Sequence, residues 1–151
     1  MAATIRIQAQ SFDAAAETAA LTRGRADVGA VVAFTGLCRD EGGKLTALEL
    51  EHYPGMAEAE IARIVAQAED RWPLLGLTVV HRFGLIRPGE EIVLVLTASS
   101  HRRAAFEAAE FLMDYLKTRA PFWKREHLKD GTVGGWVEAK DVDDRAAERW
   151  L

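Results

Sequence analysis

The sequence predicts an α+β fold. Its 151 residues are 49% apolar and 28% charged, the usage of an ordinary globular chain with a sizeable core, and this length favours one domain spanning residues 1–151. The predicted elements run β-α-β-β-α-β-β-α-β-β, so pairs of consecutive strands separate the helices. Such pairs favour antiparallel or mixed pairing over a doubly wound parallel sheet.

The first third of the chain alternates strands with one helix and one loop. Thr4–Gln8 alternates apolar and polar residues and predicts a short strand, and the alanine-rich stretch Asp13–Thr22 predicts a helix. Val28–Leu37 is nearly all apolar and rich in β-branched residues, which predicts a buried strand. The polar stretch Arg39–Lys44 contains two glycines and indicates a loop, and alternation resumes in a strand over Leu45–Tyr53.

The middle of the chain contains a second helix and two strands. Ala57–Trp72 repeats apolar residues at helical spacing and is followed by Pro73, which ends the helix. Leu77–Phe83 and Glu91–Ala98 are apolar runs typical of strands, joined through a turn at residues 87–89.

A third, long helix follows, and two short strands end the prediction. Ser99 or Ser100 offers an N-cap, and Pro121 follows the end of the helix near Thr118. This helix carries Phe106, Ala109, Met113 and Leu116 on one side. Two short strands, Phe122–His127 and Trp136–Ala139, are expected around the turn at residues 131–135.

Composition and motifs exclude several classes of protein. No apolar run approaches the ~18 residues that cross a bilayer, and the N-terminus lacks the pattern of a signal peptide, so we expect a cytoplasmic protein without a membrane partner. The net charge of −4 argues against nucleic-acid binding. The phosphate-binding patterns GxxxxGK[ST] and GxGxxG, the zinc motif HExxH and the nucleophile motif GxSxG do not occur, and the four histidines lack metal-ligand spacing.

Positive charge is concentrated in one segment. Residues 101–129 carry a net charge of +3, whereas the rest of the chain carries −7. His101 and Arg102 are expected in the first turn of the long helix, where exposed N–H groups and the positive end of the dipole favour an anion such as phosphate. Arg39 follows a predicted strand, a usual place for a functional side chain. A solvated helix face is the alternative interpretation of such a charge run.

Two lysines lie near the other end of that helix. Lys117 and Lys124 stand in the stretch YLKTRAPFWKRE, among aromatic and cationic neighbours that make a lysine easier to deprotonate. The alternative is that Lys117 is a C-terminal helix lysine stabilised by the dipole. The lone Cys38 is interpreted as a buried residue rather than a nucleophile, and the four tryptophans are too far apart in sequence to suggest a stacking platform.

Four stretches together resemble one protein family. They are GAVVAFTGLCRD (residues 29–40), LEHYPGMAE (residues 50–58), SSHRRAAFEAAEFLMDYLKTRAPFWKRE (residues 99–126) and WVEAK (residues 136–140). This chain resembles the large, catalytic subunit of molybdopterin synthase. The resemblance runs from about residue 28 to the C-terminus and implies an α/β-hammerhead-like core with a small additional β-rich subdomain.

The resemblance also implies a reaction and a partner. The family converts cyclic pyranopterin monophosphate to molybdopterin by forming a dithiolene. Its sulfur comes from the thiocarboxylated C-terminal glycine of a small ubiquitin-like subunit, whose tail ends in Gly-Gly. Two large subunits form a homodimer and carry one small subunit each, which gives a heterotetramer. No metal or organic cofactor is implied for this sulfur transfer.

Carried over by residue, the resemblance assigns catalysis to Lys117 and Lys124 and substrate binding to Arg39, His101 and Arg102. We expect these cations to gather the phosphorylated pterin and the thiocarboxylate in one cavity. Lys140, at the end of WVEAK, and the Arg39–Lys44 loop are candidates to contribute to the site of a neighbouring protomer. Two other readings stay open: a non-catalytic adaptor that binds a ubiquitin-like tail, and a phosphate-binding transferase without a protein partner.

Overall fold

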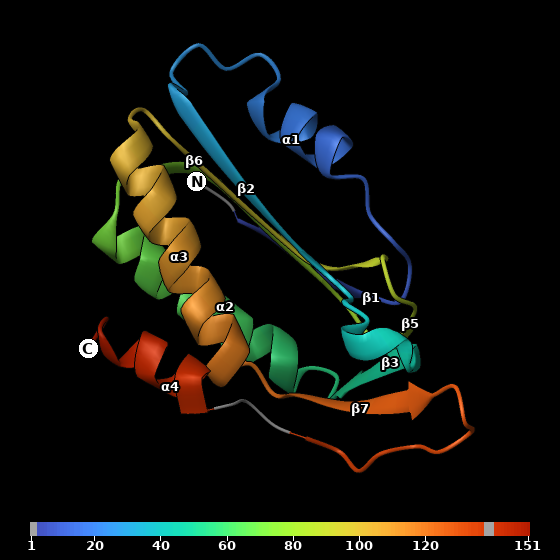
Figure 1. Ribbon diagram of the computed structural model, residues 1–151. Coiled ribbons are helices and arrows are strands. Elements are labelled where there is room, and N and C mark those ends of the chain that lie inside the picture. The colour runs from blue at the N-terminus through green and yellow to red at the C-terminus, as the bar shows by residue number, and fades with distance from the viewer. Residues whose placement is uncertain (1–2, 138–140) are drawn as a thin grey trace.

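The computed structural model describes residues 3–137 and 141–151 (Figure 1). In this part of the chain the fold is α+β, with two sheets and four α-helices, as the sequence predicts. The strands are β1 (Thr4–Gln8), β2 (Ala30–Leu37), β3 (Leu45–His52), β4 (Leu74–Arg82), β5 (Gly84–Ile86), β6 (Glu91–Ser99) and β7 (Phe122–Leu128). The helices are α1 (Ala14–Thr22), α2 (Met56–Arg71), α3 (Arg102–Thr118) and α4 (Asp141–Glu148), with a short 3₁₀ turn η1 (Glu41–Gly43).

The larger sheet has the strand order β1-β4-β6-β2 and forms the main core. β1 is parallel to β4, and the other two pairs are antiparallel. Helices α2 and α3 cover one face of this sheet and α1 the other (Figure 1). Alternation along β4 and β6 explains the layers, because Leu77 and Val95 pack toward α2 and α3, whereas Val80 and Leu94 pack toward α1.

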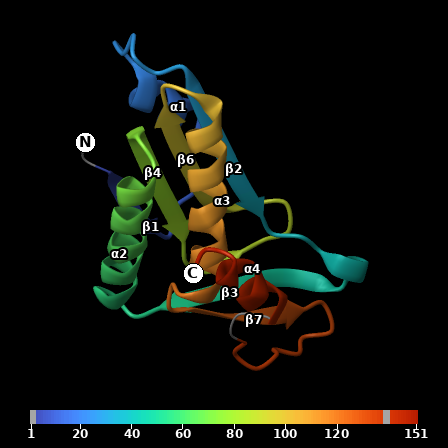
Figure 2. The same cartoon turned by 90° about the vertical axis from the view of Figure 1, so that its left-hand side faces the viewer.

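The smaller sheet has the order β5-β3-β7 and is antiparallel throughout. It crosses beneath the ends of α2 and α3 that lie away from the start of α3 (Figure 2). Its own small core contains Cys38, Leu45, Leu50 and Ile86. The three-residue strand β5 was not predicted, because so short a segment has no measurable alternation.

The prediction of a buried strand over Val28–Leu37 is wrong in one respect. The strand exists, but β2 is an edge strand of the four-stranded sheet, and Phe34 and Leu37 are 41% and 56% exposed. An apolar run predicts that a strand is covered on its faces. It does not predict whether a neighbouring strand of the same chain pairs with each of its two edges. The molecule therefore displays an apolar strand edge.

The C-terminal prediction also needs correction. The described part of Trp136–Ala139 forms only an isolated bridge between Val137 and Lys124, and Ala139 and Lys140 lie outside the described residues. The helix α4 was not predicted. It is followed by Trp150, whose ring lies edge-on to Phe111 and Trp72 and whose indole Nε1 donates a hydrogen bond to Asp114 at 2.6 Å.

Within the described ranges, no helix has both the length and the apolar character needed to cross a membrane.

Candidate functional site

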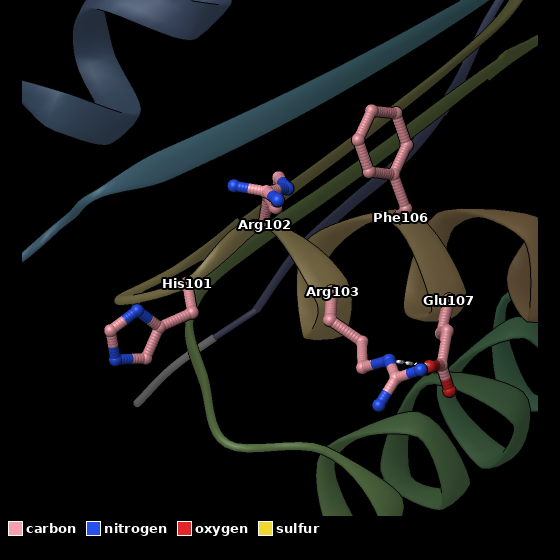
Figure 3. Close-up of a pocket in the computed structure, with 5 residues that line it drawn as sticks. All are labelled: His101, Arg102, Arg103, Phe106 and Glu107. Atoms are coloured by element: carbon pink, nitrogen blue, oxygen red, sulfur yellow. Dashed lines mark ion pairs between the residues drawn. The ribbon is translucent and has the colours of Figure 1, made fainter.

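The start of α3 forms a cationic pocket of about 580 Å³, lined by His101, Arg102, Arg103, Phe106 and Glu107 (Figure 3). His101 is the N-cap, has extended backbone angles and makes no side-chain cap. The prediction that Ser99 or Ser100 caps this helix is wrong, because the Ser99 hydroxyl instead donates to the Pro73 carbonyl at 2.8 Å. The first N–H groups of α3 thus have no side-chain acceptor from the N-cap, which favours an external anion.

The two arginines of the pocket have different surroundings. Arg103 pairs with Glu107, four residues later, at 3.3 Å between Nε and Oε1. Arg102 points away from that pair (Figure 3), and no carboxylate of the described residues forms an ion pair with it. The guanidinium of Arg102 therefore remains available for an anionic ligand. Phe106 stands at the rim and is 60% exposed, whereas Ala109 and Leu116, predicted on the same side of α3, are buried.

Lys117 and Lys124 lie at the opposite end of α3. Lys117 is exposed in the last turn of α3, and Lys124 is half-buried in β7, where its register partner on β3 is Leu50. Arg39 follows the last residues of β2 and is exposed directly after Cys38, which packs with Leu50. The fold thus places Arg39, Lys117 and Lys124 at the end of the molecule that contains the smaller sheet.

A buried aromatic stack lies beside Lys117. The rings of His81 and Phe122 are parallel, with centroids 3.8 Å apart, and His52 stacks on the same phenylalanine at 5.7 Å. The ring Nδ1 of His81 donates to the Arg82 carbonyl at 2.8 Å. Burial lowers the pKa of His81 to about 4, and the nearby charge of Lys117 adds to this effect. His81 is therefore neutral at pH 7, a feature that the sequence did not indicate.

The five predicted site residues form two groups within one chain. Arg102 and Lys117 are fifteen residues apart on one helix, which corresponds to about 22 Å along its axis. The register of β2 gives the same result, because Ala30 pairs with Ser99 beside the start of α3, whereas Leu37 pairs with Glu91 at the other end. The expectation that all five cations share one cavity is therefore not met within a single chain.

Cys38 is not placed as a nucleophile. Its side chain is buried, its Sγ lies 3.7 Å from the Ile86 carbonyl, and burial raises the pKa of the thiol. A reactive cysteine needs the opposite environment, one that stabilises the thiolate. In the described part of the chain, no three His, Cys, Asp or Glu side chains are grouped to hold a metal ion.

Comparison with known proteins identifies the family. The profile of the family described as MoaE protein matches residues 7–119, which is most of the chain. A protein of Mesorhizobium japonicum named molybdopterin synthase catalytic subunit is 74% identical over 150 residues, covering 99% of this chain and 94% of that protein.

The chain belongs to the MoaE family.

Solved structures agree with this membership. A molybdopterin biosynthesis MoaE protein from Burkholderia ambifaria superposes with a TM-score of 0.85 at 48% identity, covering 99% of this chain and 98% of that one. A chain from a Helicobacter pylori structure, described as a protein-protein complex of subunits 1 and 2 of molybdopterin-converting factor, has a TM-score of 0.70 at 22% identity, covering 91% and 90%. At that identity the likeness concerns the MoaE fold alone.

Proposed function

We propose that this chain is the catalytic subunit of molybdopterin synthase, a cytoplasmic sulfurtransferase that needs no cofactor for the transfer. It converts cyclic pyranopterin monophosphate to molybdopterin with sulfur from the thiocarboxylated C-terminal glycine of a small ubiquitin-like subunit. The observation that carries this proposal is the 74% identity, over 99% of the chain, to a protein named as that catalytic subunit. The two-subunit complex of the Helicobacter pylori relative supports the small partner.

The pocket at the start of α3 suits the phosphate of the substrate. Arg102 offers two directional donors to phosphate oxygens, and the helix adds N–H groups and the positive end of its dipole. His101, as the N-cap, stands beside the same N–H groups. We assign His101 and Arg102 to substrate binding, together with Arg39 at the other end of β2.

The two lysines suit the acyl chemistry. Attack of the thiocarboxylate sulfur on a side-chain carbon of the pterin forms a C–S bond while an oxygen leaving group departs from that carbon. The product is a thioester between the substrate and the carrier glycine. Water must hydrolyse this thioester, which releases the carrier as a carboxylate, before a second round. We assign Lys117 to acid–base catalysis or to stabilising the charge that develops on the acyl oxygen, with Lys124 assisting. The neutral ring of His81 beside Lys117 leaves the positive charge of this region to the lysines.

The separation of the cations supports a site completed by two copies. β2 is an apolar edge strand, and Phe34 on this edge is exposed. A twofold axis near Phe34 pairs the two β2 strands antiparallel, so that residue 30 of one copy lies beside residue 37 of the other. Because α3 runs in the same direction as β2, His101 and Arg102 of one copy then approach Lys117 of the other. This homodimer, with one small subunit on each copy, is the proposed heterotetramer.

We also propose how the fold is divided. We assign residues 1–151 to one domain, with the α/β-hammerhead-like core around the four-stranded sheet and the β5-β3-β7 sheet as the additional β-rich subdomain. The separate small core of that sheet, which contains Leu45 and Ile86, supports this division.

A reconstituted reaction tests the proposal. Purified chain is incubated with thiocarboxylated carrier and cyclic pyranopterin monophosphate, and dithiolene product is measured over time. We expect product with the wild-type chain and a loss of at least about a hundredfold with Lys117→Ala, the size typical of removing an acid–base or charge-stabilising group. Carrier binding without product would instead indicate the adaptor, and product without any carrier would indicate the transferase that needs no protein partner.

A further inference from the structure

A second pocket, of about 370 Å³, lies on the smaller sheet and has no part in the reaction proposed above. Its lining is aromatic and acidic and consists of Glu51, His52, Tyr53, Trp123 and Trp136. The rings of Tyr53 and Trp123 meet edge-on, with centroids 5.0 Å apart. Trp123 and Trp136 thus line one pocket although they are distant in sequence. The sequence separation of the tryptophans therefore did not predict which of them lie together.

The pocket faces away from the lysine of the same strand. On β7, successive side chains alternate between the two faces of the sheet, so Trp123 and Arg125 share one face and Lys124 projects to the other. On β3, Glu49 and Glu51 lie opposite Arg125 and Trp123 in the register. The pocket therefore lies one residue from Lys124 along β7 but on the opposite face.

The same sheet face already binds one guanidinium of its own. Arg125 donates from Nε to Glu49 at 2.8 Å and stacks over the ring of Trp136 at 4.3 Å. A carboxylate and an indole thus hold a cation between them. Glu51 and Trp123, the next register pair on this face, repeat this combination of carboxylate and indole. Among the described residues, no ammonium or guanidinium group forms an ion pair with Glu51.

His52, next to Glu51 on β3, directs its ring to the other face of the sheet, where it stacks on Phe122. His52 is only 9% exposed, and its Nδ1 has no hydrogen-bond partner in the part of the chain that the structure describes. That nitrogen lies 3.8 Å from Oε1 of Glu51, which also accepts the main-chain N–H of His52 at 3.0 Å. The nitrogen itself is buried, so a ligand in the pocket does not reach it. The side chain of Glu51 is 58% exposed, so its carboxylate is the acceptor available to a ligand on the pocket face.

We propose that this pocket binds the guanidinium or ammonium head of a basic side chain presented by the small carrier subunit, an inference that rests on the proposed function. The head group donates to the carboxylate of Glu51 while it lies against the rings of Tyr53 and Trp123. The carboxylate selects a cation over the phosphorylated pterin. The carrier is favoured over a second copy of this chain as the source of the basic side chain. In the proposed reaction the carrier tail ends near Lys124, which is next to Trp123 of the pocket along β7, whereas the second copy pairs at the edge of β2.

A small probe tests the pocket directly. The chain is titrated with n-butylguanidinium and, as a neutral analogue, with n-butylurea, while the indole N–H signals of Trp123 and Trp136 are followed by NMR after assignment with Trp→Phe variants. We expect saturable shifts of both signals and affinity about tenfold higher for the cation, as for a charge-assisted contact. Glu51→Gln should abolish this preference, and Asp70→Asn, which removes an exposed carboxylate on α2, should not. Equal, weak binding of both probes would overturn the proposal that this pocket binds a cationic head group.

The carrier is then tested by calorimetry. Glu51→Gln should weaken carrier binding about tenfold, and Asp70→Asn should leave it unchanged, whereas turnover at saturating carrier should change in neither variant. Unchanged carrier affinity in Glu51→Gln, with the probe still bound by the wild type, would overturn the assignment of the carrier. Failure of the proposed function gives a different result, because the wild-type chain would then form no dithiolene whatever the probe does.

Discussion

Two inactive variants should restore each other's activity if the site is divided between two copies. Arg102→Ala removes an anion-binding guanidinium at the start of α3, and Lys117→Ala removes an ammonium about 22 Å away at its end. Within one chain this separation is too large for a single substrate molecule. Across the twofold axis proposed at β2, the start of one α3 meets the end of the other, so each site takes one of these residues from each copy.

The expected activity follows from counting sites. A dimer that contains one Arg102→Ala copy and one Lys117→Ala copy has one site with both side chains intact and one site with both removed. It should therefore show about half of the wild-type turnover, and an equal unsorted mixture, in which half of the dimers are mixed, should show about a quarter. Each variant alone should show less than about one hundredth.

The assay uses dimers that carry a different affinity tag on each copy, purified in two steps and supplied with thiocarboxylated carrier and pterin substrate. A matched control combines a wild-type copy with a copy that carries both substitutions. In that dimer each divided site lacks one side chain, so it should be inactive. The reasoning is refuted if the control dimer keeps half of the activity and the complementing dimer none, because sites within single chains give that pattern.

Three further predictions concern single residues. Cys38→Ser should keep turnover within about twofold, since in the proposed reaction the sulfur comes from the carrier and this thiol is buried with a raised pKa; a loss of dithiolene formation would contradict this. His81 has a folded pKa of about 4, below the value of about 6.5 in an unfolded chain, so its protonation opposes folding. Between pH 7 and pH 4.5, the free energy of unfolding measured in urea should fall by about 2 kcal/mol more in the wild type than in His81→Gln. Equal losses in both proteins would show that protonation of His81 does not oppose folding. Asp114→Ala should cost about 1–3 kcal/mol in the same assay, because Asp114 accepts hydrogen bonds from Trp150 and Arg149; an unchanged midpoint would show that α4 is held by other contacts.

Elements with a strong periodic pattern were predicted well from the sequence. The strand predicted over Glu91–Ala98 is β6 (Glu91–Ser99), and the long helix ends at Thr118 as expected. These patterns are local consequences of burial, so a window of residues contains them. α4 is amphipathic, but it is only eight residues long and mostly polar, so its pattern is short. The edge position of β2 depends on strand order, which no local window contains.

The chemistry of the candidate site was easier to predict than its geometry. The basic character of residues 101–129 and the resemblance together supplied Lys117, Lys124, Arg39, His101 and Arg102. The separation of Arg102 from Lys117 follows from helix rise alone, whereas the positions of Arg39 and Lys124 depend on how β2 and β7 pack in the fold. The pocket at Glu51 and Trp123 needed the structure, since only the β3–β7 register places these two residues together.

The electrostatics of the helices support a ligand at the start of α3. In α2, Glu58 stands in the first turn and accepts the Gly55 N–H, and Arg71 stands in the last turn, so both charges complement the helix dipole. α3 begins with Arg102 and Arg103 and has no acidic residue in its first turn. Cations at the positive end of a helix each cost about 0.3–1 kcal/mol. The charges of α2 therefore complement its dipole, whereas the charges at the start of α3 oppose it and lower stability. A bound anion at the start of α3 offsets that loss, and the phosphate of the proposed substrate is such an anion.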